Sequence, residues 1–156
     1  MTALDILIDY KQLVEALADA VIFADLSGVI RFWNPAAGRL FGFTEAEALG
    51  NSLDLIVPER FRERHWAGYN KAMATGQTRY AHDVLRVPAV HKDGRPLSIA
   101  FTVGLLHDPQ GNVTGILAVI RDETARFAED RDLRKQLAEF EQRERINGTQ
   151  APAGKS

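Results

Sequence analysis

Residues 21–50 constrain the fold more than any other part of the chain. The segment opens with two short β-rich runs, VIFAD and VIRFW, joined by the turn-forming residues Leu26-Ser27-Gly28. Asn34-Pro35 follows directly, and this pair favours a helix start because asparagine caps the first turn and proline fits its first position. The pattern predicts a β-hairpin followed by two short helices, with Gly50 ending the helical block.

Three further strands are predicted downstream, at residues 80–90, 97–106 and 113–121. They are separated by two turn signals, Lys92-Asp93-Gly94 and Asp108-Pro109-Gln110-Gly111. In the strand from Leu97, large apolar residues alternate with small ones, so one face should cover the interior. Together with the hairpin, these runs predict an α+β fold built on a five-stranded antiparallel sheet.

Length and composition indicate one domain. The 156 residues can bury a single core, and a net charge of −2 gives no reason to expect a nucleic-acid or membrane partner. The absence of cysteine excludes disulfides, thiolate metal sites and cysteine nucleophiles. No apolar run approaches the ~20 residues that span a bilayer, and the N-terminus is unlike a signal peptide, so we expect a cytoplasmic location.

Amphipathic helices are predicted on both sides of the sheet core, which we assign to residues 19–124. The first covers residues 1–18, and the second, at residues 125–146, is highly charged with an apolar stripe of Leu133, Leu137 and Phe140. Because such a charged helix can bury only one narrow face, we expect a homodimer through these flanking helices, with packing against the chain's own sheet as the alternative. Residues 147–156 are predicted to be a disordered tail.

Residues 58–76 predict a helix with a histidine on its apolar face. Phe61, His65, Tyr69 and Met73 recur at every fourth position and so share a side of the helix, with Gly68 beside them. A neutral imidazole in an apolar pocket is a standard axial ligand of haem iron, and a glycine leaves space for a flat macrocycle. The alternative is a partly exposed His65 that caps or packs. Trp66 is interpreted as a packing residue.

Catalytic motifs are missing from the sequence. There is no nucleophile elbow, phosphate-binding glycine loop, metalloprotease helix or kinase phrase. We therefore expect a chain that is not an enzyme and whose output comes from a partner or another domain.

Five phrases, in this order, carry a family resemblance: ADLSGVIRFWNPAAGRLFGFTEAEALGNS, LIVPERFRERH, MATGQTR, KDGRPLSIAFTV and GILAVIRDET. The chain resembles the PAS (sensory box) family. The resemblance implies the PAS fold, with short helices on one face of the sheet, and a role as a sensory and signal-transduction module. It also implies flanking helices that pair between subunits and pass a signal to a kinase, transcription factor or other output domain.

Within that family the wording is closest to the haem-binding PAS sensors of the FixL oxygen-sensor class. These carry their axial histidine in the same helix, just upstream of a phrase like Met73-Ala74-Thr75-Gly76, so His65 inherits the role of ligand to the iron of haem b. The implied function is sensing of oxygen, CO, NO or redox state. The cofactor-binding residues would be His65, Gly68 and Tyr69 on the helix and Tyr80, His82, Leu85, Phe101, Val103 and Leu117 from the sheet side.

The chain departs from this class at one position. The class has an arginine where this sequence has Leu85, and the adjacent Arg86 would point to the opposite face of a regular strand. The alternative function is a PAS module without haem that mediates protein interaction and dimerisation, or binds another small apolar or flavin-like ligand. A stand-alone regulator of a kinase or transcription factor is a third. A flavin adduct of the LOV type is excluded because it needs a cysteine.

Overall fold

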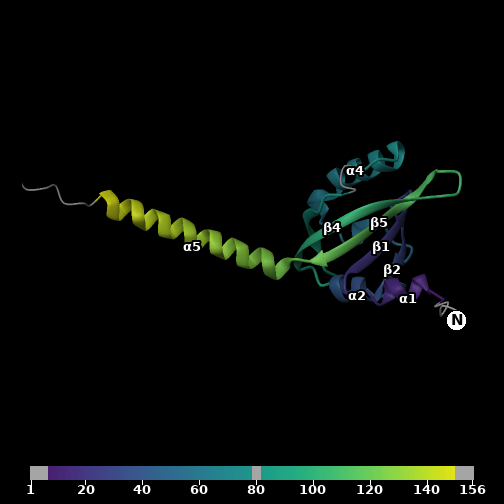
Figure 1. Cartoon of the computed structure of the whole chain (residues 1–156), viewed down its shortest axis with the longest axis horizontal. Helices are drawn as coiled ribbons and strands as arrows, with labels where there is room; N and C mark the ends of the chain where they lie inside the picture. The colour runs from purple at the N-terminus through teal and green to yellow at the C-terminus, as the bar shows by residue number, and fades with distance from the viewer. Residues whose placement is uncertain (1–6, 79–81, 150–156) are drawn as a thin grey trace, which may run out of the picture. The chain divides into compact units, whose positions relative to one another are not determined.

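The computed structural model describes residues 7–78 and 82–149, drawn in Figure 1. The chain divides into two units, one ending at Asp122 and one beginning at Glu123. The strands of the first unit are β1 (Ala20–Asp25), β2 (Ile30–Trp33), β3 (Leu85–Val90), β4 (Pro96–His107) and β5 (Val113–Asp122). Its helices and 3-10 turns are α1 (Tyr10–Glu15), α2 (Pro35–Phe41), α3 (Glu45–Ala48), η1 (Leu53–Leu55), η2 (Glu59–Phe61) and α4 (Arg62–Thr75). The second unit holds α5 (Thr124–Thr149).

The five strands form one antiparallel sheet in the order β2-β1-β5-β4-β3. Directly paired residues share a face of such a sheet. Ala118 of β5 pairs with Ile22 of β1 and with Val103 of β4, and this face, which we call the inner face, carries the core. The opposite face is the outer face. The predicted α+β fold with five antiparallel strands is confirmed.

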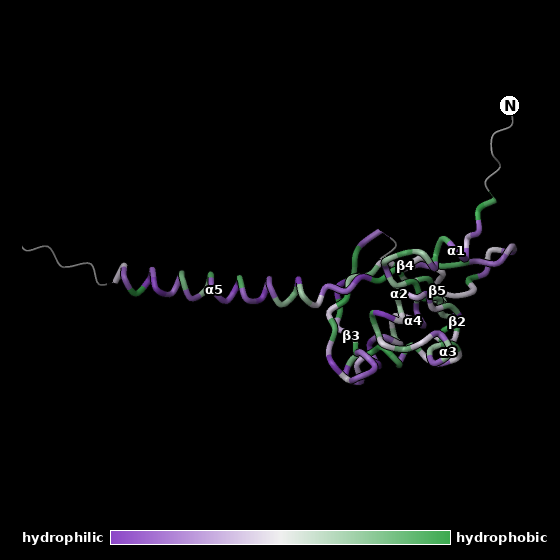
Figure 2. The backbone as a smooth tube through the Cα atoms, turned by 90° about the horizontal axis from the view of Figure 1, so that it is seen from below, coloured by the Kyte–Doolittle hydropathy of each residue, from purple (hydrophilic) through white to green (hydrophobic). Residues whose placement is uncertain are grey.

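The hydrophobic core lies between the inner face and the short helices. Phe41 of α2 and Ala48 of α3 are fully buried and pack with Ile22 and Ile30 of the sheet. Tyr69 closes the same core from α4. Figure 2 shows the short helices gathered around the strands in this unit. Short helices on one face of the sheet were predicted, and the structure has them.

Asp25 organises the β1–β2 turn. Its carboxylate accepts hydrogen bonds from the backbone N–H groups of Ser27 (2.9 Å) and Val29 (3.1 Å), and from Nε of Arg31 (2.8 Å). Burial acts to raise the pKa of Asp25, but the hydrogen bonds from Arg31 and the two backbone groups outweigh it and hold the pKa below the ordinary 3.8. Gly28 ends the turn with φ +76°, a conformation that favours glycine.

Replacing Asp25 by asparagine is expected to lower the free energy of unfolding at pH 7 by up to about 1 kcal/mol, because a partly exposed ion pair is screened by water. Asparagine keeps a side-chain oxygen for the turn but loses the charge that pairs with Arg31. The pKa of Asp25 is lower in the folded state than its ordinary value. The charged carboxylate therefore contributes to the free energy of unfolding above pH 3.8, and this contribution is lost as the pH falls through the folded-state pKa. Urea titrations of both proteins at pH 7 and pH 2 measure it, and an equal difference at the two pH values would contradict the prediction.

Asn34 is a buried polar residue, 1% exposed, and its side chain makes four hydrogen bonds. Its Oδ1 accepts from the backbone N–H groups of Val21 (2.8 Å) and Ala37 (3.0 Å). Its Nδ2 donates to the backbone oxygens of Val14 (3.0 Å) and Asp19 (3.1 Å). The predicted cap of α2 is confirmed, and the same side chain ties α2 to β1 and to α1.

The edge strands of the sheet, β2 and β3, are each contacted by another segment. On β2, the N–H of Gly50 donates to the backbone oxygen of Ile30 at 2.9 Å. On β3, the N–H of Val90 donates to the backbone oxygen of Ile56 at 3.0 Å. Pro88 lies two residues before Val90 on the same edge and has no N–H to offer.

The flanking helices differ in length from their predictions. Helix α1 covers six residues because Asp9 caps its start and the chain leaves the helix at Ala16 before entering β1; residues 1–6 lie outside the described part. Helix α5 runs on to Thr149, so residues 147–149 of the predicted disordered tail are helical. The rest of that tail, residues 150–156, lies outside the described residues.

Candidate functional site

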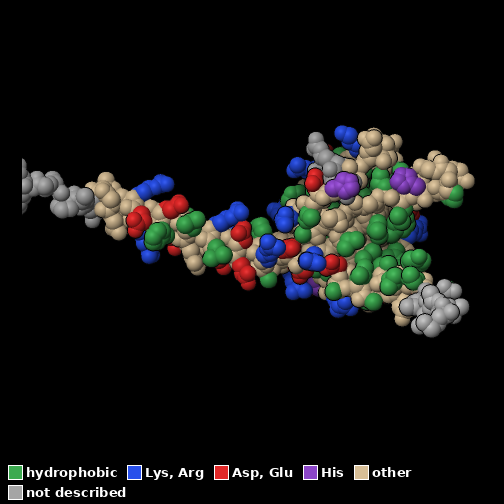
Figure 3. Space-filling model, viewed as in Figure 1, with side chains coloured by type: hydrophobic (Ala, Val, Ile, Leu, Met, Phe, Trp, Pro, Cys, Tyr) green, Lys and Arg blue, Asp and Glu red, His purple; other side chains and the backbone are tan. Residues whose placement is uncertain are grey.

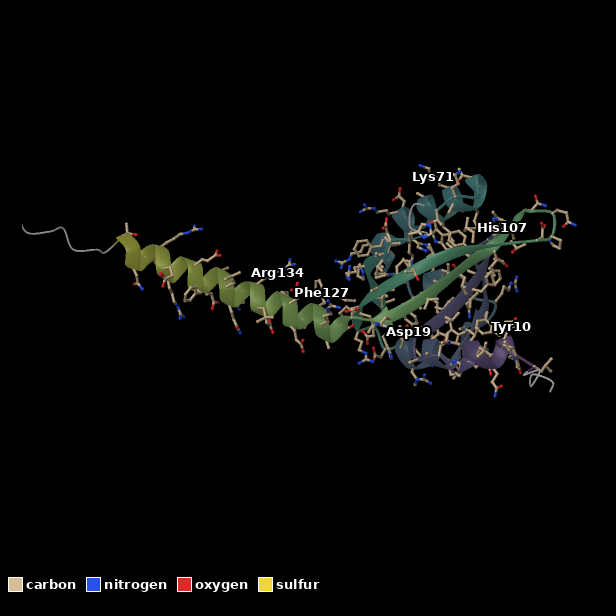
Figure 4. All side chains as sticks on the ribbon, viewed as in Figure 1. Tyr10, Asp19, Lys71, His107, Phe127 and Arg134 are labelled. Atoms are coloured by element: carbon tan, nitrogen blue, oxygen red, sulfur yellow. The ribbon has the colours of Figure 1, made fainter. Side chains whose placement is uncertain are left out.

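Helix α4 carries the histidine that the sequence singles out. The short turn η2 leads into the helix, and Gly76 ends it in the left-handed conformation. Tyr69 of this helix is 6% exposed and belongs to the core, whereas Lys71 lies on the side away from the sheet (Figure 4). His65, one turn before Tyr69, is half-buried.

The Nδ1 atom of His65 is buried and has no hydrogen-bond partner within the described structure. Buried polar atoms in folded proteins are almost always paired, so this atom is an exception that needs an explanation. Burial lowers the pKa of His65 below its usual 6.5, and the charge of Asp54 opposes that shift in part. The imidazole is therefore neutral at pH 7, which is the state that binds a metal ion.

Two aromatic side chains surround His65. The centroid of its ring lies 4.8 Å from that of Trp66 and 5.9 Å from that of Tyr69. The Tyr69 hydroxyl donates a hydrogen bond to the backbone oxygen of Asp25, and burial raises the pKa of this phenol, so it stays protonated. Nε1 of Trp66 donates to Oδ1 of Asp54 at 2.7 Å. Neither Trp66 nor Asp54 was predicted from the sequence to belong to the site.

The sheet supplies an apolar wall. Leu85 of β3 pairs with Phe101 of β4, and Val103 follows two residues later, so all three predicted residues share the inner face and are half-buried. Leu117 does not join them. It pairs with Gly104 and Phe23, which puts it on the outer face, and its assignment to the pocket is corrected for that reason.

The remaining predicted residues are Gly68, His82 and Tyr80. Gly68 is exposed, and a Cβ atom there would meet nothing within 4 Å, so α4 does not need a glycine at this position to admit a neighbour. His82 is exposed and precedes β3. Tyr80 lies outside the described residues.

Arg86 lies on the outer face, as expected for the neighbour of Leu85. It pairs with Ala100 in a β3–β4 ladder that runs without a bulge. The inner-face residues of β3 are Leu85, Val87 and Ala89, all of them apolar.

The other histidines described by the structure are engaged or exposed. Nδ1 of His91 accepts a hydrogen bond from the N–H of Asp93 at 3.1 Å, and His107 is exposed at the end of β4 (Figure 4). Within residues 7–78 and 82–149, no group of three or more His, Asp or Glu side chains could hold a metal ion.

Two open grooves lie elsewhere on the first unit. One, of about 520 Å³, is bounded by residues 58–60 and by the β3–β4 hairpin. The other, of about 360 Å³, lies along α2 and the start of α3. Neither is lined by His65 or by the wall residues, so the grooves are separate from the candidate site.

The sheet order and the helices packed against its inner face define an α+β domain. A family model described as the PAS fold matches residues 8–122, and the chain therefore belongs to the PAS family. The crystal structure of the PAS domain of a protein from Colwellia psychrerythraea is similar, with a TM-score of 0.65 and 21% identity over 74% of this chain and 94% of that one. At that identity the likeness concerns the fold.

Two of the relatives are named as sensor proteins. Sensor protein FixL of Bradyrhizobium diazoefficiens is 28% identical over 94 residues, which are 60% of this chain and 19% of that protein. Oxygen sensor protein DosP of Escherichia coli is 25% identical over 126 residues, 81% of this chain and 15% of that protein. The chain thus spans less than a fifth of the length of either relative. Among the helices described here, none is both long and apolar enough to cross a membrane.

Proposed function

We propose that this PAS domain is a haem-based sensor of a diatomic gas or of redox state, with His65 as the axial ligand of the iron. The observation that carries the proposal is the buried ring nitrogen of His65, which has no partner among the described residues and belongs to a neutral imidazole. Coordination to a metal ion would satisfy a nitrogen of this kind. The names of the relatives, a sensor and an oxygen sensor, agree with a sensory role.

The inner face of the sheet offers apolar side chains to a cofactor. Leu85, Phe101 and Val103 present apolar side chains on the inner face, and Met73 of α4 packs against the same core. A bound haem would supply an iron that coordinates a gas or changes its oxidation state. The protein's own contribution is to hold the imidazole neutral, to keep water from the apolar face of the cofactor, and to link α4 to the sheet.

Reconstitution of the purified chain with haemin tests the proposal. We expect a sharp Soret band that saturates at one haem per chain. A protein that stays colourless after haemin treatment and desalting would contradict it.

A second function, protein interaction through the flanking helices, is favoured by their exposed apolar residues. Tyr10 and Leu13 of α1 are 74% and 55% exposed. On α5, Leu133, Leu137 and Phe140 are all more than half exposed, and Figure 3 shows acidic and basic side chains between the apolar ones. Apolar stripes of this kind are buried when two helices pair, so we include a homodimer in the proposed function. The output would come from a kinase, a transcription factor or another domain.

Removing the residues before Leu13 or after Thr124 is therefore expected to convert a dimer into a monomer, as measured by light scattering. The single substitution Leu137→Glu should weaken the dimer because it puts a charge into the stripe of α5. Lys135→Glu is the matched control, since position 135 lies on the opposite side of the helix from Leu133 and Leu137. A full-length chain that is already monomeric would refute the dimer.

A further inference from the structure

The indole of Trp66 is held from two sides by segments outside α4. Its Nε1 donates to Oδ1 of Asp54, in η1, at 2.7 Å. Its six-membered ring lies against the β1–β2 turn at Gly28, so closely that a Cβ atom at position 28 would overlap it. Because Gly28 also has a positive φ, the turn and the ring fit together only with glycine at that position.

His65, Trp66 and Tyr69 are in mutual ring contact. The imidazole meets the indole edge-on, at 78° and 4.8 Å between centroids, and lies at 35° to the Tyr69 ring. Trp66 and Tyr69 also contact each other edge-on, with centroids 5.3 Å apart. Since the hydroxyl of Tyr69 is itself bonded to Asp25, both aromatic neighbours of His65 are fixed by hydrogen bonds to other segments.

We propose that Trp66 is a positioning residue, which sets the plane of the His65 imidazole and is itself oriented by Gly28 and Asp54. A side chain locked by packing and by hydrogen bonds can hold a neighbouring ligand in one geometry. The carboxylate oxygen of Asp54 that accepts the indole hydrogen bond has a cationic neighbour, Nε of Arg62 at 3.9 Å. That this positioning supports a bond from His65 to haem iron rests on the function proposed above. The arrangement of the three rings does not, because it is present without a cofactor.

The first test uses the full chain without haem. In Trp66→Leu, the NMR signal of the His65 Cε1 proton should shift, because the ring current of the edge-on indole is removed. Trp33→Phe is the matched control. Its Nε1 donates to the backbone oxygen of Phe43 at 3.0 Å, so this variant also loses an indole hydrogen bond, away from the site. A His65 signal that moves no more in Trp66→Leu than in Trp33→Phe would overturn the proposal.

The second test measures haem release from the reconstituted chain to an excess of apomyoglobin. Loss of groups that support a metal ligand costs about 10–100-fold in affinity, so we expect release from Trp66→Leu to be faster by a factor of that order. Release at the wild-type rate would contradict the positioning role. A wild-type chain that takes up no haem would instead refute the proposed function and leave the NMR test to decide the arrangement of the rings.

Asp54 provides a milder pair of variants in case Trp66→Leu does not fold. Asp54→Asn keeps an oxygen that accepts the indole hydrogen bond, so the His65 signal should stay near its wild-type position. Asp54→Leu removes the acceptor and should shift it. Equal effects of the two substitutions would show that the hydrogen bond does not orient Trp66, and the proposal would fail.

Discussion

Replacing His65 with alanine is expected to abolish the Soret band of the haemin-treated protein. The imidazole is the proposed ligand, and its buried Nδ1 has no other partner in the part of the chain that the structure describes. The apolar wall alone gives no bond to iron, so affinity should fall by at least the 10–100-fold seen when a ligand is merely disturbed. Absorption spectra of haemin titrations measure the effect.

Two other histidines serve as controls for this substitution. His91 already accepts a hydrogen bond from Asp93, and His107 is exposed at the end of β4. His91→Ala and His107→Ala should therefore keep the band. Circular dichroism on each variant separates loss of the ligand from loss of the fold. A band that survives in folded His65→Ala but disappears in either control would move the ligand to that histidine.

The largest expected effect on stability comes from Asn34→Leu. Leucine has nearly the same size but leaves the N–H groups of Val21 and Ala37 without their acceptor. Each buried unsatisfied group costs about 1–3 kcal/mol, and loss of a helix cap alone costs about 1 kcal/mol. The oxygens of Val14 and Asp19 lose their donor too. We expect a fall in the free energy of unfolding of about 3–5 kcal/mol in urea titrations.

Asn51 offers a matched control for this measurement. Its Nδ2 also donates to a backbone oxygen, that of Glu47 at 2.5 Å, but the residue is exposed. Water can replace the lost partner there, so Asn51→Leu should change stability by about 0.5 kcal/mol or less. If both substitutions lowered the free energy of unfolding by the same amount, the four buried hydrogen bonds of the Asn34 side chain would not be a major source of stability.

The fold was predictable because its strongest signals are local. The turn at Leu26-Ser27-Gly28, the cap at Asn34 and the hairpin turn at residues 92–94 each depend on residues close in sequence. Strand β3 was predicted to begin at residue 80, but it begins at Leu85, because residues 82–83 form a bend. Residues 79–81 lie outside the described part.

The site was less predictable because it depends on contacts between distant segments. Leu117 was assigned to the wrong face because β5 is apolar on both, with Ile116 and Ala118 inside and Leu117 and Val119 outside, so no alternation marks the inner one. The bond from Trp66 to Asp54 crosses twelve residues and two 3-10 turns, which periodicity cannot describe. One signal was available in the sequence: the indole N–H of a tryptophan that packs in the interior needs a hydrogen-bond acceptor, so an acceptor for Trp66 could have been expected.

The edges of the sheet limit how this protein can assemble. Successive backbone N–H groups of a strand point to opposite sides in the plane of the sheet. The N–H of Val90 points away from β4, toward the open edge of β3, and position 88 faces the same edge. Because Pro88 has no N–H, this edge lacks a hydrogen-bond donor there. At the other end of the sheet, Gly50 already bonds to Ile30. A strand from another molecule would meet interrupted ladders at both ends, so growth by strand addition, including the cross-β stacking of fibrils, has a poor template here. We therefore expect any association to use side-chain surfaces, whose partners can be chosen by shape and charge.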